Sequence, residues 1–341
     1  MAAGMLDDHP GADNIDRCFS TGSCPMQPVS PFRASLLLLI LFICPPIAAA
    51  KTPAVVVSIK PLHSLVSGVM QGVAEPALLI HGSQSPHTFS LAPSDVRLIS
   101  RADLIVWVGE VLEAPLAKTI APNRKAAEVI TFIDMEGIVR AGSREGGAWE
   151  AHAHHHEEPH EKPPLHHDHA GEDPHLWLSP GNAGRLVDAV ADALAGVDPD
   201  NAGVYRLNAR ALHERIDRLD AELMSGLGKV QEKPYIVFHD AYQLFEKHYG
   251  LNPAGSVVIN PERMPGARRI HDLRERLAES GVQCVFSEPQ FEPGLVATIT
   301  EGTQARSGLL DPIGADLEPG PDAWFQLMRN LATALVECLG D

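Results

Sequence analysis

Residues 77–108 read ALLIHGSQSPHTFSLAPSDVRLISRADLIVWV and contain two short apolar runs, at 77–80 and 104–108. A helix candidate that begins at Pro93 separates the two runs, and proline suits the first turn of a helix. A third apolar run, 55–59, precedes them along the chain. Brief strands rich in Val, Ile and Leu that alternate with helices are typical of a parallel sheet covered by helices on both faces. This stretch therefore predicts an α/β fold.

The same alternation of short apolar runs and helices resumes in the last third of the chain. Strands are expected at 235–238, 255–259 and 284–286, and helices near 241–249, 265–280, 293–306 and 321–339. Before this second series, the amphipathic stretch from Asp198 to about Leu227 would form a helix about 40 Å long. We predict two doubly wound α/β lobes, residues 51–197 and 229–341, joined by a single long rigid helix at 198–228.

Composition excludes several classes of protein. The chain has 341 residues, of which 45% are hydrophobic and 21% charged, so it can build cores and is not a disordered chain. Its 27 Lys and Arg against 44 Asp and Glu give a net charge of −17, which opposes binding to the phosphates of nucleic acids. The 17 histidines are the unusual feature, and they suggest a protein that handles metal.

The first fifty residues are typical of a secretory signal peptide. The apolar run LLLLILFI at 36–43 follows Arg33 and leads into a stretch of small residues that ends at Ala50. The run is too short to span a bilayer, so we expect an exported protein that is cleaved after about Ala50. Acidic residues before Met26 are unusual in such a segment, and we expect translation to begin at Met26.

Three histidines lie where an α/β protein is expected to place metal ligands. The C-terminal ends of parallel strands form the ligand-binding edge of a doubly wound sheet. His87 and His239 each follow a predicted strand, and His175 lies where the ordered pattern resumes after a polar segment. Asp311 also follows a strand and could supply a fourth, oxygen ligand; the alternative is a structural turn residue. Three imidazoles with at most one carboxylate favour Zn²⁺ over Mn²⁺, which prefers oxygen ligands.

The polar segment at 136–173 has almost no apolar content and interrupts the α/β pattern. A loop of this length is either functional or disordered, and we expect a flexible insert in the first lobe. Its eight histidines are His152, His154, His155, His156, His160, His166, His167 and His169. We interpret them as an auxiliary group that collects zinc for the cleft; the alternative is a solvated loop with incidental affinity for metal.

Two cysteines, Cys284 and Cys338, remain after the leader is removed. An even pair in an exported protein indicates one disulfide. Two buried free thiols are the alternative.

Several motifs in combination resemble one family of proteins. They are GSQSPHTFSLAPSDVRLISRADLIVWVG (82–109), DPHLWLSP (173–180), VFHDAYQLFEKHYGL (237–251), NPERMPGARRI (260–270), CVFSEPQF (284–291) and LLDPIGADLEPG (309–320). Together they are similar to the ZnuA-type substrate-binding proteins of zinc-uptake ABC transporters, across essentially all of 51–341.

This resemblance implies a periplasmic, high-affinity Zn²⁺ receptor, not an enzyme, with the ion in the cleft between the lobes. The zinc histidines of the family fall on His87, His175 and His239, and its disulfide falls on the two remaining cysteines. The family often has an acidic residue before the first histidine, whereas Pro86 stands here, which leaves Asp311 or a water as the fourth ligand. The implied partners are an inner-membrane permease and its cytoplasmic ATPase, with the receptor acting as a monomer.

Other functions are less consistent with the sequence. The pattern His156-Glu157-Glu158-Pro159-His160 matches the H-E-x-x-H motif of a secreted zinc hydrolase, but that mechanism needs a helix, which Pro159 opposes. A receptor of the same fold for Mn²⁺ or another divalent ion is a further alternative. A surface adhesin of this fold would favour a lipidated anchor, which the leader does not predict.

Overall fold

Two parallel β-sheets of four strands each organise the part of the chain that the structure describes. This computed structural model describes residues 52–144, 149, 171–258, 265–279, 281–292 and 294–340. The strand order is β2-β1-β3-β4 in the first sheet and β6-β5-β7-β8 in the second. The strands are β1 (Val55–Val57), β2 (Ala77–Leu78), β3 (Leu104–Trp107), β4 (Glu128–Thr131), β5 (Tyr235–Val237), β6 (Pro253–Ser256), β7 (Cys284–Ser287) and β8 (Arg306–Leu309).

Both sheets have the same topology. In each, the first strand along the chain lies between the second and the third, and every neighbouring pair is parallel. The chain therefore builds outward in opposite directions from β1 and from β5, which leaves a crevice at the carboxyl ends of these strands. The predicted fold of two parallel α/β sheets is confirmed.

The helices begin where the sequence places prolines and polar caps. Those among the described residues are α1 (Lys60–Val69), α2 (Pro93–Arg101), α3 (Ala114–Asn123), α4 (Pro180–Val197), α5 (Ala202–Leu227), α6 (Gln243–Tyr249), α7 (Ala267–Glu279), α8 (Gly294–Thr300) and α9 (Ala323–Leu339). Each of the first four has a proline within its first two positions. Ser179 caps α4, because its Oγ accepts the Asn182 N–H at 3.3 Å.

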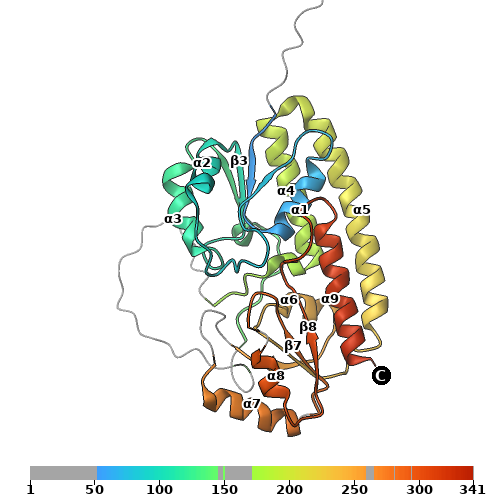
Figure 1. Cartoon of the computed structure of the whole chain (residues 1–341). Coiled ribbons are helices and arrows are strands. Elements are labelled where there is room, and N and C mark those ends of the chain that lie inside the picture. Colours follow the sequence, from blue (N-terminus) through green and yellow to red (C-terminus); the bar gives the residue numbers. More distant parts are fainter. Residues whose placement is uncertain are drawn as a thin grey trace, which may run out of the picture. The chain divides into compact units, whose positions relative to one another are not determined.

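The longest of these helices, α5, has 26 residues, which corresponds to about 39 Å. It packs along α1, α4, α6 and α9, and in Figure 1 it runs beside α9. Its buried side chains, three or four residues apart, are Tyr205, Ala209, Leu212, Ile216, Leu219, Leu223 and Leu227. The helix begins at Ala202, after a 3₁₀ turn at Pro199–Asn201, rather than at residue 198 as predicted. Its role as a rigid link between two lobes stays a prediction.

The last helix, α9, packs on α1 and α5 as well as on β8 of the second sheet. Trp324 on α9 is fully buried, and its backbone N–H donates to Ser64 Oγ on α1 at 2.9 Å. The Trp324 indole N–H also donates to the carbonyl of Trp177 at 2.8 Å. The end of the chain thus completes the core around its first helix.

One strand and one helix of the first α/β unit, β4 and α3, were not predicted from the sequence. In β4, an edge strand, only Ile130 is buried, so the short apolar signature of an interior strand is absent. In α3, Pro122 lies inside the helix and weakens the helical pattern. Both are nevertheless tied to the fold, because β4 pairs along its whole length with β3 and α3 buries Leu116 and Ile120.

The described ends of the segment 136–173 are ordered. Ile138 is buried, and Gly142 and Glu172 form an antiparallel bridge. Ser143 N–H donates to Gly171 O at 2.7 Å. The ordered part of the chain therefore extends further into this segment than predicted.

Several predictions concern residues outside the described part of the chain. They include the eight histidines from His152 to His169, the signal peptide at 1–50 and the start at Met26. Within the described residues, no helix combines the length and hydropathy required to cross a bilayer.

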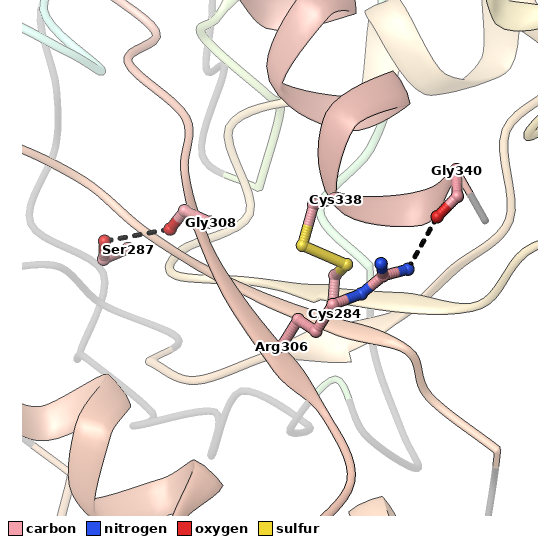
Figure 2. Close-up of a disulfide and its surroundings, with 6 residues drawn as sticks. All are labelled: Cys284, Ser287, Arg306, Gly308, Cys338 and Gly340. Carbon is pink, nitrogen blue, oxygen red and sulfur yellow. Dashed lines mark hydrogen bonds between the residues drawn. A yellow bond between two sulfur atoms is a disulfide. The ribbon is translucent and has the colours of Figure 1, made fainter.

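A disulfide joins Cys284 at the start of β7 to Cys338 near the end of α9, as predicted (Figure 2). Two further contacts surround it. Arg306 donates to the carbonyl of Gly340 at 2.8 Å, which fastens the last turn of α9 to β8. Gly308 lies so close to Phe286 that a Cβ there would be 2.5 Å from the ring, so only glycine fits. The alternative of two free thiols is excluded.

Candidate metal centre

His87, His175 and His239 lie together although they are far apart in the sequence. One ligand nitrogen from each lies within 4.8 Å of the others, and the group is the only one of its kind among the described residues. The Nε2 atoms of His175 and His239 are 3.3 Å apart. Two nitrogens that bind a tetrahedral zinc at 2.0–2.1 Å would be about 3.3 Å apart. The spacing of the histidines therefore suits one small cation.

Each histidine is placed by the end of a regular element. His87 lies in the loop after β2, and His239 lies two residues after β5. His175 immediately precedes the 3₁₀ turn Leu176–Leu178, whose three side chains are buried. The two strands belong to different sheets, so the cluster lies where the carboxyl ends of both sheets meet.

Two buried carboxylates orient two of the three imidazoles. Asp173 Oδ1 lies 2.7 Å from His175 Nδ1, and Glu288 Oε1 lies 2.7 Å from His239 Nδ1. Asp173 is 3% exposed and Glu288 is 2% exposed. Each carboxylate accepts a hydrogen bond from the Nδ1–H of its ring, so in the neutral imidazole the lone pair is at Nε2, where a metal could bind. Carboxylate–histidine pairs of this kind are typical of metal ligands.

Burial sets the protonation of the cluster. Burial, together with the nearby His175 and His239, lowers the pKa of His87 to about 2. Burial also lowers the pKa of His175 well below its ordinary value. Burial opposes protonation of His239 too, but the charge and hydrogen bond of Glu288 outweigh it and raise the pKa of His239. Two imidazoles are thus neutral near pH 7, and His239 is the ligand whose protonation competes most with a metal as the pH falls.

A small cavity surrounds the three histidines. The open space measures about 10 Å³. The other residues that line it are Ser85, Pro86, Trp177, Glu288, Gln290, Phe291, Pro312 and Ile313. Phe291 stacks on Phe238 with ring centroids 4.6 Å apart, and this fixes one apolar wall beside His239. A cavity of this size fits an ion with at most one further small ligand.

Comparison with known proteins bears on what this cavity holds. The model of the family described as "Zinc-uptake complex component A periplasmic" (ZnuA) matches residues 55–338. The chain belongs to this family. The family resemblance predicted from the sequence motifs is therefore confirmed.

Individual relatives agree with the family match. The "High-affinity zinc uptake system protein ZnuA" of Brucella abortus is 44% identical over 310 residues, which cover 85% of this chain and 93% of the relative. The protein of the same name from Yersinia pestis is 36% identical over 293 residues, covering 84% and 91%. A solved structure titled "Crystal structure of ZnuA" matches with a TM-score of 0.69 at 23% identity, covering 85% of this chain and all of that one. The fold of this chain is thus that of the ZnuA-type structures.

Asp311, the predicted fourth ligand, is not part of the histidine group. Its Oδ1 accepts the N–H groups of Ile313 and Gly314 at 3.1 and 3.0 Å, and its Oδ2 accepts that of Ala315. The carboxylate is folded back onto its own turn, which is the geometry of a structural turn residue. Its remaining contact is with Gln290, whose Nε2 donates to Asp311 Oδ1 at 2.9 Å.

Two of the residues that support the ligands were not predicted from the sequence. Asp173 precedes His175 by two residues, and Glu288 follows β7, the strand beside β5. A search for carboxylates close to each ligand in sequence, or at the ends of adjacent strands, could have found both. Gln290 carried no such signal, because a lone glutamine in a loop is usually solvated.

Proposed function

We propose that this chain is a periplasmic receptor that binds one Zn²⁺ between His87, His175 and His239 and delivers it to an ABC importer. The observation that carries the proposal is the convergence of three imidazole nitrogens, two of them oriented by buried carboxylates. The zinc-uptake names of its relatives support the choice of ion. The importer would supply a permease in the inner membrane and a cytoplasmic ATPase, and the receptor would act as a monomer.

The donor set favours zinc over the alternatives. Three imidazoles suit Zn²⁺, whereas a Mn²⁺ receptor would use more carboxylate oxygens. Asp173 and Glu288, the two acids that contact ligand histidines, already bind their Nδ1 side. Membership of a family of solute-binding components also favours a receptor over a hydrolase.

The segments outside the described residues complete the proposal. Residues 1–50 would direct export and be removed after about Ala50. The eight histidines between 152 and 169 would collect zinc near the cluster. The described end of segment 136–173 lies beside the cluster, which supports this role. There the Asp173 N–H donates to Ala141 O at 2.8 Å, and the Asp173 carboxylate holds His175.

Titration of the metal-free protein with Zn²⁺, in competition with a strong chelator, tests the proposal. We expect one ion to bind tightly per chain, because the chelator removes zinc from weaker sites. Failure to retain any ion against the chelator would overturn the proposal. Mn²⁺ and Ca²⁺ serve as comparison ions and should not compete at equal concentration.

The same titration at several pH values should show weaker binding in acid. The pKa of His239 is raised, so below that pKa a proton occupies a ligand and competes with zinc. His87 and His175 stay neutral, since their pKa values are lowered. Binding is therefore strongest above the pKa of His239 and falls about tenfold for each pH unit below it. Equal zinc affinity at pH 7.5 and 5.5 would contradict the assignment to His239. A thousandfold fall in zinc affinity per pH unit, which requires three protons, would contradict it as well.

Asp173→Asn should weaken zinc binding by about 10–100-fold, the usual effect of removing a carboxylate that orients a metal-bound histidine. Asp188→Asn is a matched control, because Asp188 makes the same 2.7 Å contact with His213 on the surface, away from the cluster. The control should bind zinc like the parent protein. Equal affinities of the two variants would mean that Asp173 does not support a ligand.

A further inference from the structure

Gln290 lines the histidine cavity, and one of its two polar atoms has no protein partner among the described residues. Its Nε2 donates to Asp311 Oδ1 at 2.9 Å. Its Oε1 is buried and makes no hydrogen bond with the described part of the chain. A buried acceptor without a partner is costly, so this oxygen atom indicates that something else donates to it.

Asp311 fixes which way the Gln290 amide faces. A carboxylate only accepts hydrogen bonds, and the three N–H groups of its own turn hold this one in place. The NH₂ group of Gln290 must therefore face Asp311. A reversed amide would place two acceptors 2.9 Å apart, so Oε1 is directed away from Asp311.

The other side chains that line the cavity include few hydrogen-bond acceptors that could lie beside a bound ion. Pro86, Trp177, Phe291, Pro312 and Ile313 are apolar side chains. Glu288 also lines the cavity, and its Oε2 is a second buried, charged oxygen without a partner among the described residues. Its other oxygen already holds His239. Ser85 lines the cavity too, but its Oγ already accepts the His87 N–H at 3.3 Å, so Gln290 supplies the neutral side-chain oxygen of the lining that has no partner among the described residues.

Three histidines leave one position of a tetrahedral zinc, and a water molecule that takes it has two O–H groups to donate. We propose that Gln290 Oε1 accepts a hydrogen bond from a zinc-bound water that completes the site, and that Asp311 holds the amide in the receiving orientation. This inference rests on the proposed function. It gives Asp311 a role two hydrogen bonds from the ion, in place of direct coordination. It also makes the fourth ligand neutral and exchangeable.

Gln290→Met tests the inference, since methionine keeps the length of the side chain and removes both polar groups. Zinc affinity of the full chain, measured by chelator competition, should fall about 10–100-fold, as it does when an outer partner of a metal site is lost. Gln304→Met is the matched control, because Gln304 is exposed and lines a different cavity. The melting temperature of the metal-free variants is measured as well. Loss of the contact with Asp311 would lower that temperature, whereas loss of the contact with the bound water would lower only the zinc affinity. An affinity equal to that of the control would overturn the inference.

A zinc-loaded crystal structure is the second test, and it decides the matter if Gln290→Met does not fold. We expect a water bound to zinc, with its oxygen about 2.6–3.0 Å from Gln290 Oε1. A protein oxygen bound directly to zinc in the fourth position would overturn the inference. His175→Ala, measured in the same series, distinguishes the two levels of the argument. If it binds zinc normally, the proposed function fails; if only Gln290→Met is without effect, the receptor stands and the water bridge fails.

Discussion

Replacing His175 with alanine should lower the zinc affinity of this protein by about a hundred- to a thousandfold. Zinc binding in four-ligand protein sites contributes roughly 10–16 kcal/mol, which is about 2.5–4 kcal/mol for each ligand. Truncation of His175 also removes the imidazole that contacts the buried carboxylate of Asp173, which keeps only the backbone N–H of residue 175 as a described donor. His87→Ala and His239→Ala should have effects of the same size. Competition with a chelator of known affinity measures all three.

His213→Ala is the control for these variants. His213 also pairs with a carboxylate, Asp188, at 2.7 Å, but it lies on α5 at the surface. It should bind zinc like the parent protein. If His175→Ala retained parental affinity instead, the tight site would lie elsewhere in the chain. The histidine-rich segment from 152 to 169 would then be the first place to search.

Removal of the disulfide should have the second large effect, on stability rather than on binding. Cys284 and Cys338 are separated by 54 residues, and closing a loop of that length contributes about 4 kcal/mol in the chain-entropy account. The double variant Cys284→Ala/Cys338→Ala should lose about that free energy of unfolding. For a chain of this size the loss corresponds to a fall of roughly 7 °C in melting temperature. Urea unfolding of the metal-free protein measures it without the contribution of bound zinc.

Parent protein treated with a reductant provides the control for the cysteine variant and should unfold at the same lower urea concentration. Zinc affinity should be unchanged, because the bridge lies at the start of β7 and Glu288 follows the other end of that strand. A double variant as stable as the oxidised parent would show that the bridge closes a loop already restrained in the unfolded chain.

The position of the histidines could be predicted because it depends on a rule of topology. Parallel strands bring their carboxyl ends to one edge, so a histidine just after β2 and another just after β5 both reach the crevice. The role of Asp311 could not be predicted in this way. Asp311 also follows a strand, yet local turn geometry decides whether its carboxylate faces the ion or its own backbone, and here it faces the backbone. The edge strand β4 was missed because an edge strand lacks the continuous apolar run of an interior one.

The packing of α9 has a consequence for the order in which this protein acquires its structure. Trp324 lies within the last eighteen residues of the chain, yet it is buried against Ser64 on the first helix. Until α9 has been synthesised, the hydrophobic surface of α1 on which α9 packs stays exposed. The nascent polypeptide therefore cannot reach its final structure until α9 has been made and has left the ribosome. For a chain that we propose is exported, this late completion of the core would favour passage through a translocation channel before folding is complete.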